Sequence, residues 1–176
     1  MKPREDFLSL NIAVLTLSDT RTLEQDSSGQ YLADALREAG HQLGDRRLIK
    51  DDIYQMRAIV STWIAEPAIH AVLITGGTGF TSRDSTPEAL RPLFDKEISG
   101  FGELFRQYSA EEIGSSTIQS RAVGGLANKT LVFCMPGSTG ACRTAWERIL
   151  KEQLDSRHRP CNFAGLVVRG HHQAHG

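Results

Sequence analysis

A glycine-rich turn followed by an arginine–aspartate pair is the stretch of this chain whose residues are best suited to chemistry. Residues 71–90 read A-V-L-I-T-G-G-T-G-F-T-S-R-D-S-T-P-E-A-L. The apolar run from Ala71 to Ile74 is typical of a strand that is buried on both faces. Thr86 and Pro87 fit the N-cap and the first position of a following helix. The pattern therefore predicts a strand, a glycine turn, a polar loop and a helix, and ligands of open α/β sheets bind at such turns.

The glycines alone do not indicate a phosphate or a metal ion, but the charged residues that follow them do. The turn matches neither the P-loop nor the dinucleotide fingerprint, so its glycine count by itself favours a plain tight turn. Arg83 and Asp84 follow a few residues later. A guanidinium can pair with phosphate oxygens, and a carboxylate can hold a hard divalent cation. Together with backbone N–H groups that glycines expose to an anion, they suggest a nucleotide phosphate and its metal.

Two further strand ends could meet the same ligand. Ser18 and Asp19 follow the apolar run 11–17, and Pro136-Gly137-Ser138 follow the apolar run 130–135. The second is again a strand, a glycine-bearing turn and a helix start, which is an arrangement that binds anions. Taken by themselves, Ser18 and Asp19 favour a side-chain turn without a ligand. Asp51 and Asp52 precede an apolar helical stripe, so one of them can serve as a helix N-cap without any chemistry.

The elements that must position these residues alternate along the chain. Apolar runs predict strands at 11–17, 41–49, 71–74 and 130–135. Helical spacing of apolar residues predicts helices at 31–39, 53–64, 89–94 and 101–108, and another that begins near 141. Ser27 or Ser28 could cap the first helix, and Gly124 and Gly125 would interrupt any long element. A β-α-β-α-β order predicts a parallel sheet with right-handed crossovers.

Composition limits the classes of function. The chain has 176 residues, a formal net charge of −1 and no long basic run, which argues for one domain without a nucleic-acid partner. No apolar run approaches the ~20 residues that span a bilayer, and the charged start M-K-P-R-E-D does not fit a signal peptide. We therefore expect a cytoplasmic protein without membrane association. Cys134, Cys142 and Cys161 fit no zinc or disulfide spacing, so we expect no catalytic thiol among them.

These motifs resemble the MoaB/MogA family of molybdenum cofactor biosynthesis proteins. The T-G-G-T-G turn, the R-D-x-T-P-E string at 83–88 and the P-G-S turn at 136–138 carry the resemblance, in this order. G-F-G-E-x-F-R at 100–106 and Ser120-Arg121 also match. A-C-R-T-A-W-E and R-H-R-P-C-N-F look closest to the MoaB branch. The similarity runs from about residue 11 to 161.

The resemblance implies a fold and a domain organisation. It implies an α/β fold in which a three-layer α/β/α sandwich surrounds a mostly parallel sheet. We expect an N-terminal extension at 1–10, a single molybdopterin-binding domain at 11–163 and a flexible C-terminal tail at 164–176. The family also implies a homo-oligomer, either a trimer or a hexamer.

The resemblance further implies molybdopterin adenylyltransferase activity, with molybdopterin and ATP as substrates and Mg²⁺ as cofactor. Asp84 and Asp51 match the acidic positions that would bind the metal and support catalysis. The implied substrate-binding and nucleotide-binding residues are Ser18, Asp19, Thr75, Gly76, Gly77, Thr78, Gly79, Arg83, Pro136, Gly137 and Ser138. Such a transfer depends on positioning and charge neutralisation more than on a protein nucleophile. The alternative is a protein of the same pathway that binds or carries molybdopterin without catalysis.

Overall fold

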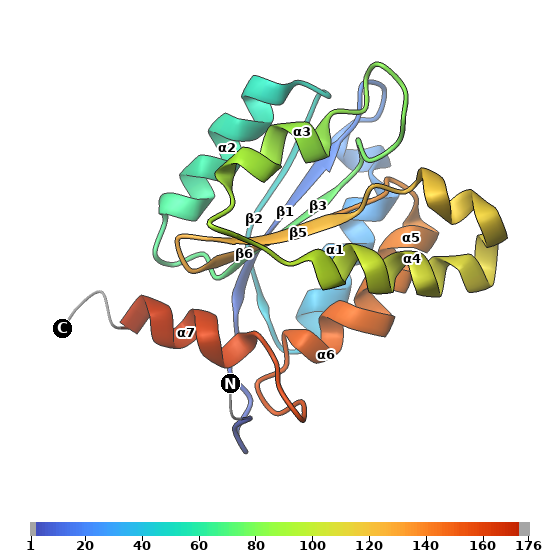
Figure 1. Ribbon diagram of the computed structural model, residues 1–176. Coiled ribbons are helices and arrows are strands. Elements are labelled where there is room, and N and C mark those ends of the chain that lie inside the picture. Colours follow the sequence, from blue (N-terminus) through green and yellow to red (C-terminus); the bar gives the residue numbers. More distant parts are fainter. Residues whose placement is uncertain (1–2, 173–176) are drawn as a thin grey trace.

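A six-stranded sheet lies between two layers of helices (Figure 1). A computed structural model describes residues 3–172. The strand order is β2-β1-β3-β6-β5-β4. The strands are β1 (Asn11–Leu17), β2 (Gln42–Ile49), β3 (Ala71–Thr75), β4 (Lys96–Glu97), β5 (Val123–Ala127) and β6 (Thr130–Met135). The first four strands of this order run parallel, and β5 and β4 are antiparallel to their neighbours, so the sheet is mostly parallel as predicted.

Successive side chains of the central strands point to opposite faces, and each face is covered by its own helices. On one face, Ile12 and Val14 pack with α1 (Ser27–Glu38), α4 (Ser99–Ile113), α5 (Thr139–Ala145) and α7 (Ala164–His172). On the other face, Ala13 and Leu15 pack with α2 (Ile53–Ala65) and α3 (Thr86–Leu90). The π-helical turn Trp146–Leu150 and α6 (Lys151–Gln153) continue α5. This arrangement confirms the predicted three-layer α/β/α sandwich.

Strand β5 was not predicted, because Gly124 and Gly125 were expected to interrupt the chain. Its two-residue partner β4 was not predicted either, because Lys96 and Glu97 form no apolar run. In β5 these glycines instead make room for aromatic rings. A Cβ at Gly125 would lie 2.2 Å from Cγ of Phe94, and one at Gly124 would lie 2.9 Å from Cδ1 of Phe133. The rings replace the side chains that a strand normally packs with, which a local pattern of residues does not show.

The helix caps differ from the predicted ones in an informative way. Asp26, rather than Ser27 or Ser28, caps α1, and its Oδ1 accepts the N–H of Gly29 at 3.0 Å. Asp52 caps α2, with Oδ1 accepting the N–H of Gln55 at 2.8 Å. The capping alternative therefore explains Asp52 and leaves the side chain of Asp51 without a capping role.

The first residues of the expected flexible tail at 164–176 form a helix that packs against the core. Helix α7 begins at Ala164, and Ala164 and Val167 are fully buried in the core. The short apolar run was read as a tail because its partners lie far away in the sequence. Residues 173–176 lie outside the described part.

Near the other terminus, Leu10 is fully buried and the N–H of Leu8 donates to Oγ of Ser156 at 2.8 Å. Within residues 3–172, no helix combines the length and the apolar character that spanning a membrane requires.

His41 should make the stability of this fold depend on pH. Its Nδ1 accepts the N–H of Leu10 at 3.0 Å, and burial lowers its pKa from 6.5 to about 4. The unfolded chain therefore takes up this proton more readily, so the free energy of unfolding should fall as the pH drops from about 6.5 to about 4. In His41→Asn, melting temperatures across this range should fall less steeply than in the wild type. Parallel curves for the two proteins would contradict this assignment.

Candidate functional site

A cavity of about 630 Å³ opens at the carboxyl ends of β1, β3 and β6. These strands are parallel neighbours, so the turns that follow them meet at one edge of the sheet. Most of the candidate residues line this one cavity: Ser18, Asp19, Asp51, Gly76, Gly77, Thr78, Gly79, Asp84, Pro136, Gly137 and Ser138. The fold thus brings together the glycine turn, Asp51 and the P-G-S turn.

Thr75 and Arg83 are the two candidate residues that do not line the cavity. Thr75 is fully buried beneath the cavity, where its Oγ1 donates to the carbonyl oxygen of Pro136 at 2.9 Å. Arg83 does not line the cavity; its Nε and Nη2 donate to Asp19 at 2.9 and 3.0 Å, and Nη2 also donates to the carbonyl oxygen of Asp51 at 2.9 Å. Both residues fix the position of segments that line the cavity.

The backbone of the glycine turn has a conformation that would be strained for residues other than glycine. Gly76 and Gly77 have φ angles of +110° and +72°. Thr86 holds the turn, because its Oγ1 donates to the carbonyl oxygen of Gly76 at 2.8 Å and its N–H to that of Gly77 at 3.0 Å. A Cβ at Gly77 would lie 2.1 Å from Oγ1 of Thr86 and 3.1 Å from Oδ1 of Asp51. Glycine therefore allows Asp51 to approach the turn.

Asp51 carries an unsatisfied oxygen in this cavity. Its Oδ1 is buried and has no hydrogen-bond partner within the described part of the chain. Burial raises the pKa of Asp51, the nearby charges of Asp19 and Asp84 raise it further, and Arg83 opposes them. A buried carboxylate oxygen without a partner is unfavourable, and a bound cation would relieve it.

The side chain of Asp84 is held next to Gly79 of the glycine turn. Its Oδ2 accepts the N–H of Thr81 at 2.9 Å and the hydroxyl of Thr81 at 2.7 Å. A Cβ at Gly79 would lie 2.8 Å from the same oxygen. Arg121 closes the loop by donating to the carbonyl oxygens of Gly79 and Asp84 at 2.7 and 3.2 Å, and by pairing with Glu88. The loop is therefore preorganised around the carboxylate of Asp84.

Asp19 differs from the other two acidic residues because its charge is compensated. The two hydrogen bonds from Arg83 lower its pKa, and the N–H of Asp51 also donates to its Oδ1 at 3.2 Å. This pair ties the end of β1 to the segment before α2. The arrangement leaves Asp51 and Asp84 as the carboxylates of the cavity whose side chains have no arginine partner in the described structure.

The serines of the other two turns accept hydrogen bonds from nearby backbone N–H groups. Oγ of Ser138 accepts the N–H of Ala141 at 3.1 Å and begins α5, and Oγ of Ser18 accepts the N–H of Arg21 at 2.9 Å. The remaining wall was not predicted from the sequence. It consists of Thr16, Phe105, Ser109, Ile113, Ser116, Gln119 and Ser120, together with neighbours of the turns. Most of these residues come from α4 and the 3₁₀ segment Gly114–Gln119, whose approach to the sheet is a tertiary contact without a local signal.

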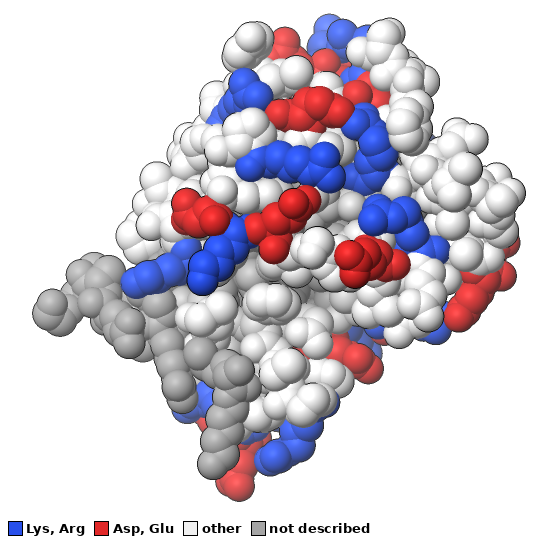
Figure 2. Space-filling view, in the orientation of Figure 1, with Lys and Arg blue, Asp and Glu red and all other residues white. Residues whose placement is uncertain are grey.

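The charged side chains on the visible face are mixed in sign. Figure 2 shows basic and acidic residues interspersed rather than gathered in a basic patch. Ion pairs of the described structure include Arg91 with Glu97 at 3.3 Å and Arg121 with Glu88. A protein that binds nucleic acid through its backbone phosphates needs a clustered basic surface, which this face does not offer.

Comparison with known proteins identifies the family. Residues 13–156 match the model of a probable molybdopterin binding domain. The chain belongs to the MoaB/MogA family. It is 60% identical to molybdenum cofactor biosynthesis protein B of Escherichia coli (strain K12) over 158 residues, which are 90% of this chain and 93% of that protein. The protein of the same name from Bacillus cereus is 47% identical over 142 residues, 80% of this chain and 84% of that protein.

Solved structures of the family have the same fold. A crystal structure of molybdenum cofactor biosynthesis protein B superposes with a TM-score of 0.84 at 41% identity and covers 94% of this chain and 98% of that chain. The tungsten cofactor synthesizing protein MoaB from Pyrococcus furiosus gives a TM-score of 0.74 at 35% identity, covering 82% of this chain and 92% of that chain. The resemblance inferred from the sequence motifs is therefore confirmed.

Removing the charge of Asp51 should stabilise the protein without ligand. Because the pKa of Asp51 is raised in the folded state, the ionised side chain favours unfolding at pH 7, and this effect disappears as the pH falls below the ordinary value of 3.8. Asp51→Asn should therefore melt at a higher temperature than the wild type at pH 7, with a smaller gain at pH 4. Asp52→Asn is the matched control, because asparagine caps a helix about as well as aspartate. A lower melting temperature of Asp51→Asn at pH 7 would refute the unfavourable burial.

Proposed function

We propose that the protein binds molybdopterin and adenylylates it with Mg-ATP, in the pathway that makes the molybdenum cofactor. The observation that carries the proposal is the unsatisfied Oδ1 of Asp51 in one cavity with Asp84 and two turns suited to anions. Family membership and the names of the relatives support the pathway and the pterin. The acidic pair supports the nucleotide, because a triphosphate reaches a protein with its divalent cation.

The donor set fits a magnesium ion that is shared with a substrate. Mg²⁺ is usually held by one or two carboxylates together with waters and substrate phosphates. In residues 3–172, no group of three or more His, Cys, Asp or Glu side chains is arranged to hold a metal by itself. Asp51 and Asp84 would hold the ion, and phosphate oxygens would complete its shell. When bound, the ion would neutralise the charge of the triphosphate.

The proposed reaction joins two phosphates. An oxygen of the terminal phosphate of molybdopterin attacks the α-phosphorus of ATP, the bond from this phosphorus to the bridging oxygen breaks, and pyrophosphate leaves. The N–H groups of the Gly76–Gly79 turn would bind phosphate oxygens on one side of the cavity. Ser138, at the start of α5, would contact the pterin or its phosphate on the other side. The residues thus contribute positioning and charge stabilisation rather than a nucleophile.

We also propose that the active form is a homo-oligomer, a trimer or hexamer, as the family implies. Several large apolar side chains are exposed, including Tyr54 at 76% and Ile118 at 75%. Such side chains can be covered by another copy of the chain. Light scattering should give the mass of a trimer or hexamer, and a monomer at all concentrations would reject this proposal.

Asp84→Asn tests the proposed catalysis. The substitution keeps the shape of the side chain and removes the charge that would hold the metal. Formation of adenylylated molybdopterin should fall by on the order of 100-fold or more, while molybdopterin binding persists. The readout is product formed from molybdopterin, ATP and Mg²⁺, with pterin binding measured separately.

Glu103→Gln is the control, because Glu103 is an exposed acidic residue of α4 outside the cavity. It should turn over like the wild type. If the wild type binds molybdopterin and gives no product, the protein is a non-catalytic binding or carrier protein of the pathway. If Asp84→Asn turns over normally, Asp84 does not hold the metal.

A further inference from the structure

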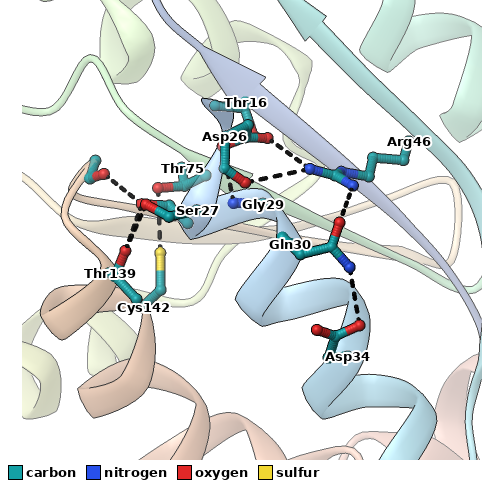
Figure 3. A network of polar contacts seen from close by, with 12 residues as sticks. Thr16, Asp26, Ser27, Gly29, Gln30, Asp34, Arg46, Thr75, Thr139 and Cys142 are labelled. Atoms are coloured by element: carbon teal, nitrogen blue, oxygen red, sulfur yellow. Dashed lines mark hydrogen bonds and ion pairs between the residues drawn. The ribbon is translucent and has the colours of Figure 1, made fainter. Parts of the chain in front are cut away.

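A buried polar network lies beneath the cavity, where β1 meets the start of α1 (Figure 3). Its centre is Asp26, which is 1% exposed. Oδ1 of Asp26 accepts the N–H of Gly29 at 3.0 Å, and Oδ2 accepts the hydroxyl of Thr16 at 2.6 Å and Nη2 of Arg46 at 3.2 Å. A charged, buried carboxylate with three donors is a strong anchor for its partners.

The bond to Asp26 determines what Thr16 offers to the cavity that it lines. A threonine hydroxyl has one proton and two lone pairs, and a carboxylate has no proton to donate. The proton of Thr16 is therefore directed at Oδ2 of Asp26. Thr16 lines the cavity and is 4% exposed, so a group of a ligand that reaches its hydroxyl has to donate the hydrogen bond.

Packing fixes this orientation. A Cβ at Gly29 would lie 2.5 Å from Oγ1 of Thr16 and 2.1 Å from Oδ2 of Asp26, so the start of α1 lies directly against the bonded pair. Arg46 holds the other side of Asp26 and also donates through Nη1 to Oε1 of Gln30 at 2.7 Å. Figure 3 shows the guanidinium between the carboxylate and the surface of α1.

The same helix start is tied to the opposite side of the cavity. Oγ of Ser28 donates to the carbonyl oxygen of Gly137 at 2.7 Å, and Oγ of Ser27 lies 3.0 Å from Oγ1 of Thr139. Gly137 also lines the cavity. The network therefore sets the position of the hydroxyl of Thr16 relative to the turn at 136–138.

We propose that the hydroxyl of Thr16 accepts a hydrogen bond from an N–H or O–H group of the bound substrate, and that Asp26 is the positioning residue that keeps it an acceptor. The inference rests on the proposed function for the identity of the substrates. Both offer such donors: ATP has ribose hydroxyls and the amino group of adenine, and molybdopterin has the N–H groups of its pterin.

Thr16→Val tests the acceptor directly. Valine keeps the branched shape and leaves Asp26 with its bonds to Gly29 and Arg46. Affinity for the recognised substrate should fall roughly three- to tenfold, the effect of one neutral hydrogen bond. Thr16→Ser restores the hydroxyl and should restore the affinity. Thr130→Val is the matched control, because Thr130 is fully buried and its hydroxyl bonds to the carbonyl oxygen of Ile69, outside the cavity.

Asp26→Asn tests whether the network keeps the hydroxyl of Thr16 a hydrogen-bond acceptor. Oδ1 of asparagine can still cap α1, but its Nδ2 cannot accept from Nη2 of Arg46, in the single or the double variant. This Nδ2 would donate to Thr16 and turn the hydroxyl proton of Thr16 towards the cavity. A donor would then face the donor of the substrate, so the affinity loss should exceed that of Thr16→Val. In the double variant Asp26→Asn/Thr16→Val, the extra loss should disappear. A purely structural role of Asp26 predicts that the double variant binds no better than Asp26→Asn.

Calorimetric titrations with ATP plus Mg²⁺ and with molybdopterin separate the sources of the donor. If ATP is the recognised substrate, 2′-deoxy-ATP and inosine triphosphate remove one donor each, and the Thr16→Val penalty should vanish with the analogue that lacks the contact. If only molybdopterin responds, the donor belongs to the pterin. Unchanged affinity of Thr16→Val for both substrates overturns the inference and leaves the proposed function standing. Absence of binding of both substrates to the wild type overturns the proposed function and this inference with it.

Discussion

The site depends on one unpaired carboxylate oxygen of Asp51, which lies against the glycine turn. Oδ1 of Asp51 is buried without a partner in the described structure, and a Cβ at Gly77 would lie 3.1 Å from it. Folding brings this oxygen near Asp84, and the two charges disfavour each other. The apo protein therefore bears an electrostatic strain that a cation would relieve, which is a common compromise between stability and function.

Three arginines around the cavity hold its loops in place. Arg83 joins Asp19 to the segment before α2, Arg121 closes the loop at 79–84, and Arg46 secures Asp26 beneath the floor. Each of these three guanidiniums is already engaged by a carboxylate or by carbonyl oxygens. Arg21 also lines the cavity, and its guanidinium makes no ion pair in the described structure, so it remains available to a phosphate beside a bound cation and backbone N–H groups.

The central fold could be predicted from local patterns. The boundaries of β1 and β6 agree with their apolar runs, because strands buried on both faces have a continuous signal. Strand β5 was missed because Gly124 and Gly125 pack against the rings of Phe133 and Phe94. Helix α7 was missed because Val167 becomes buried only through tertiary contacts. Each of these failures concerns a residue whose packing partner lies in another element of the fold.

The site shows the same division. The turns that follow parallel strands were predicted to converge, and topology brings them together. Arg83 was expected at the ligand because a guanidinium suits a phosphate, and Thr75 because of the family resemblance. Neither residue lines the cavity, and both bond to neighbouring segments. The wall from α4 and the polarity of Thr16 could not be predicted, since neither the docking of a helix nor the direction of a hydrogen bond is encoded locally.

The measurement that tests the central claim most directly is calorimetric titration of the wild-type protein with ATP, with Mg²⁺ and in EDTA. If Asp51 and Asp84 hold a cation shared with the nucleotide, ATP should bind at least about tenfold more tightly with Mg²⁺, because a lost metal bridge weakens binding by more than one ordinary hydrogen bond. Mg²⁺ without nucleotide should bind weakly. Equal ATP affinity in Mg²⁺ and in EDTA would contradict the account.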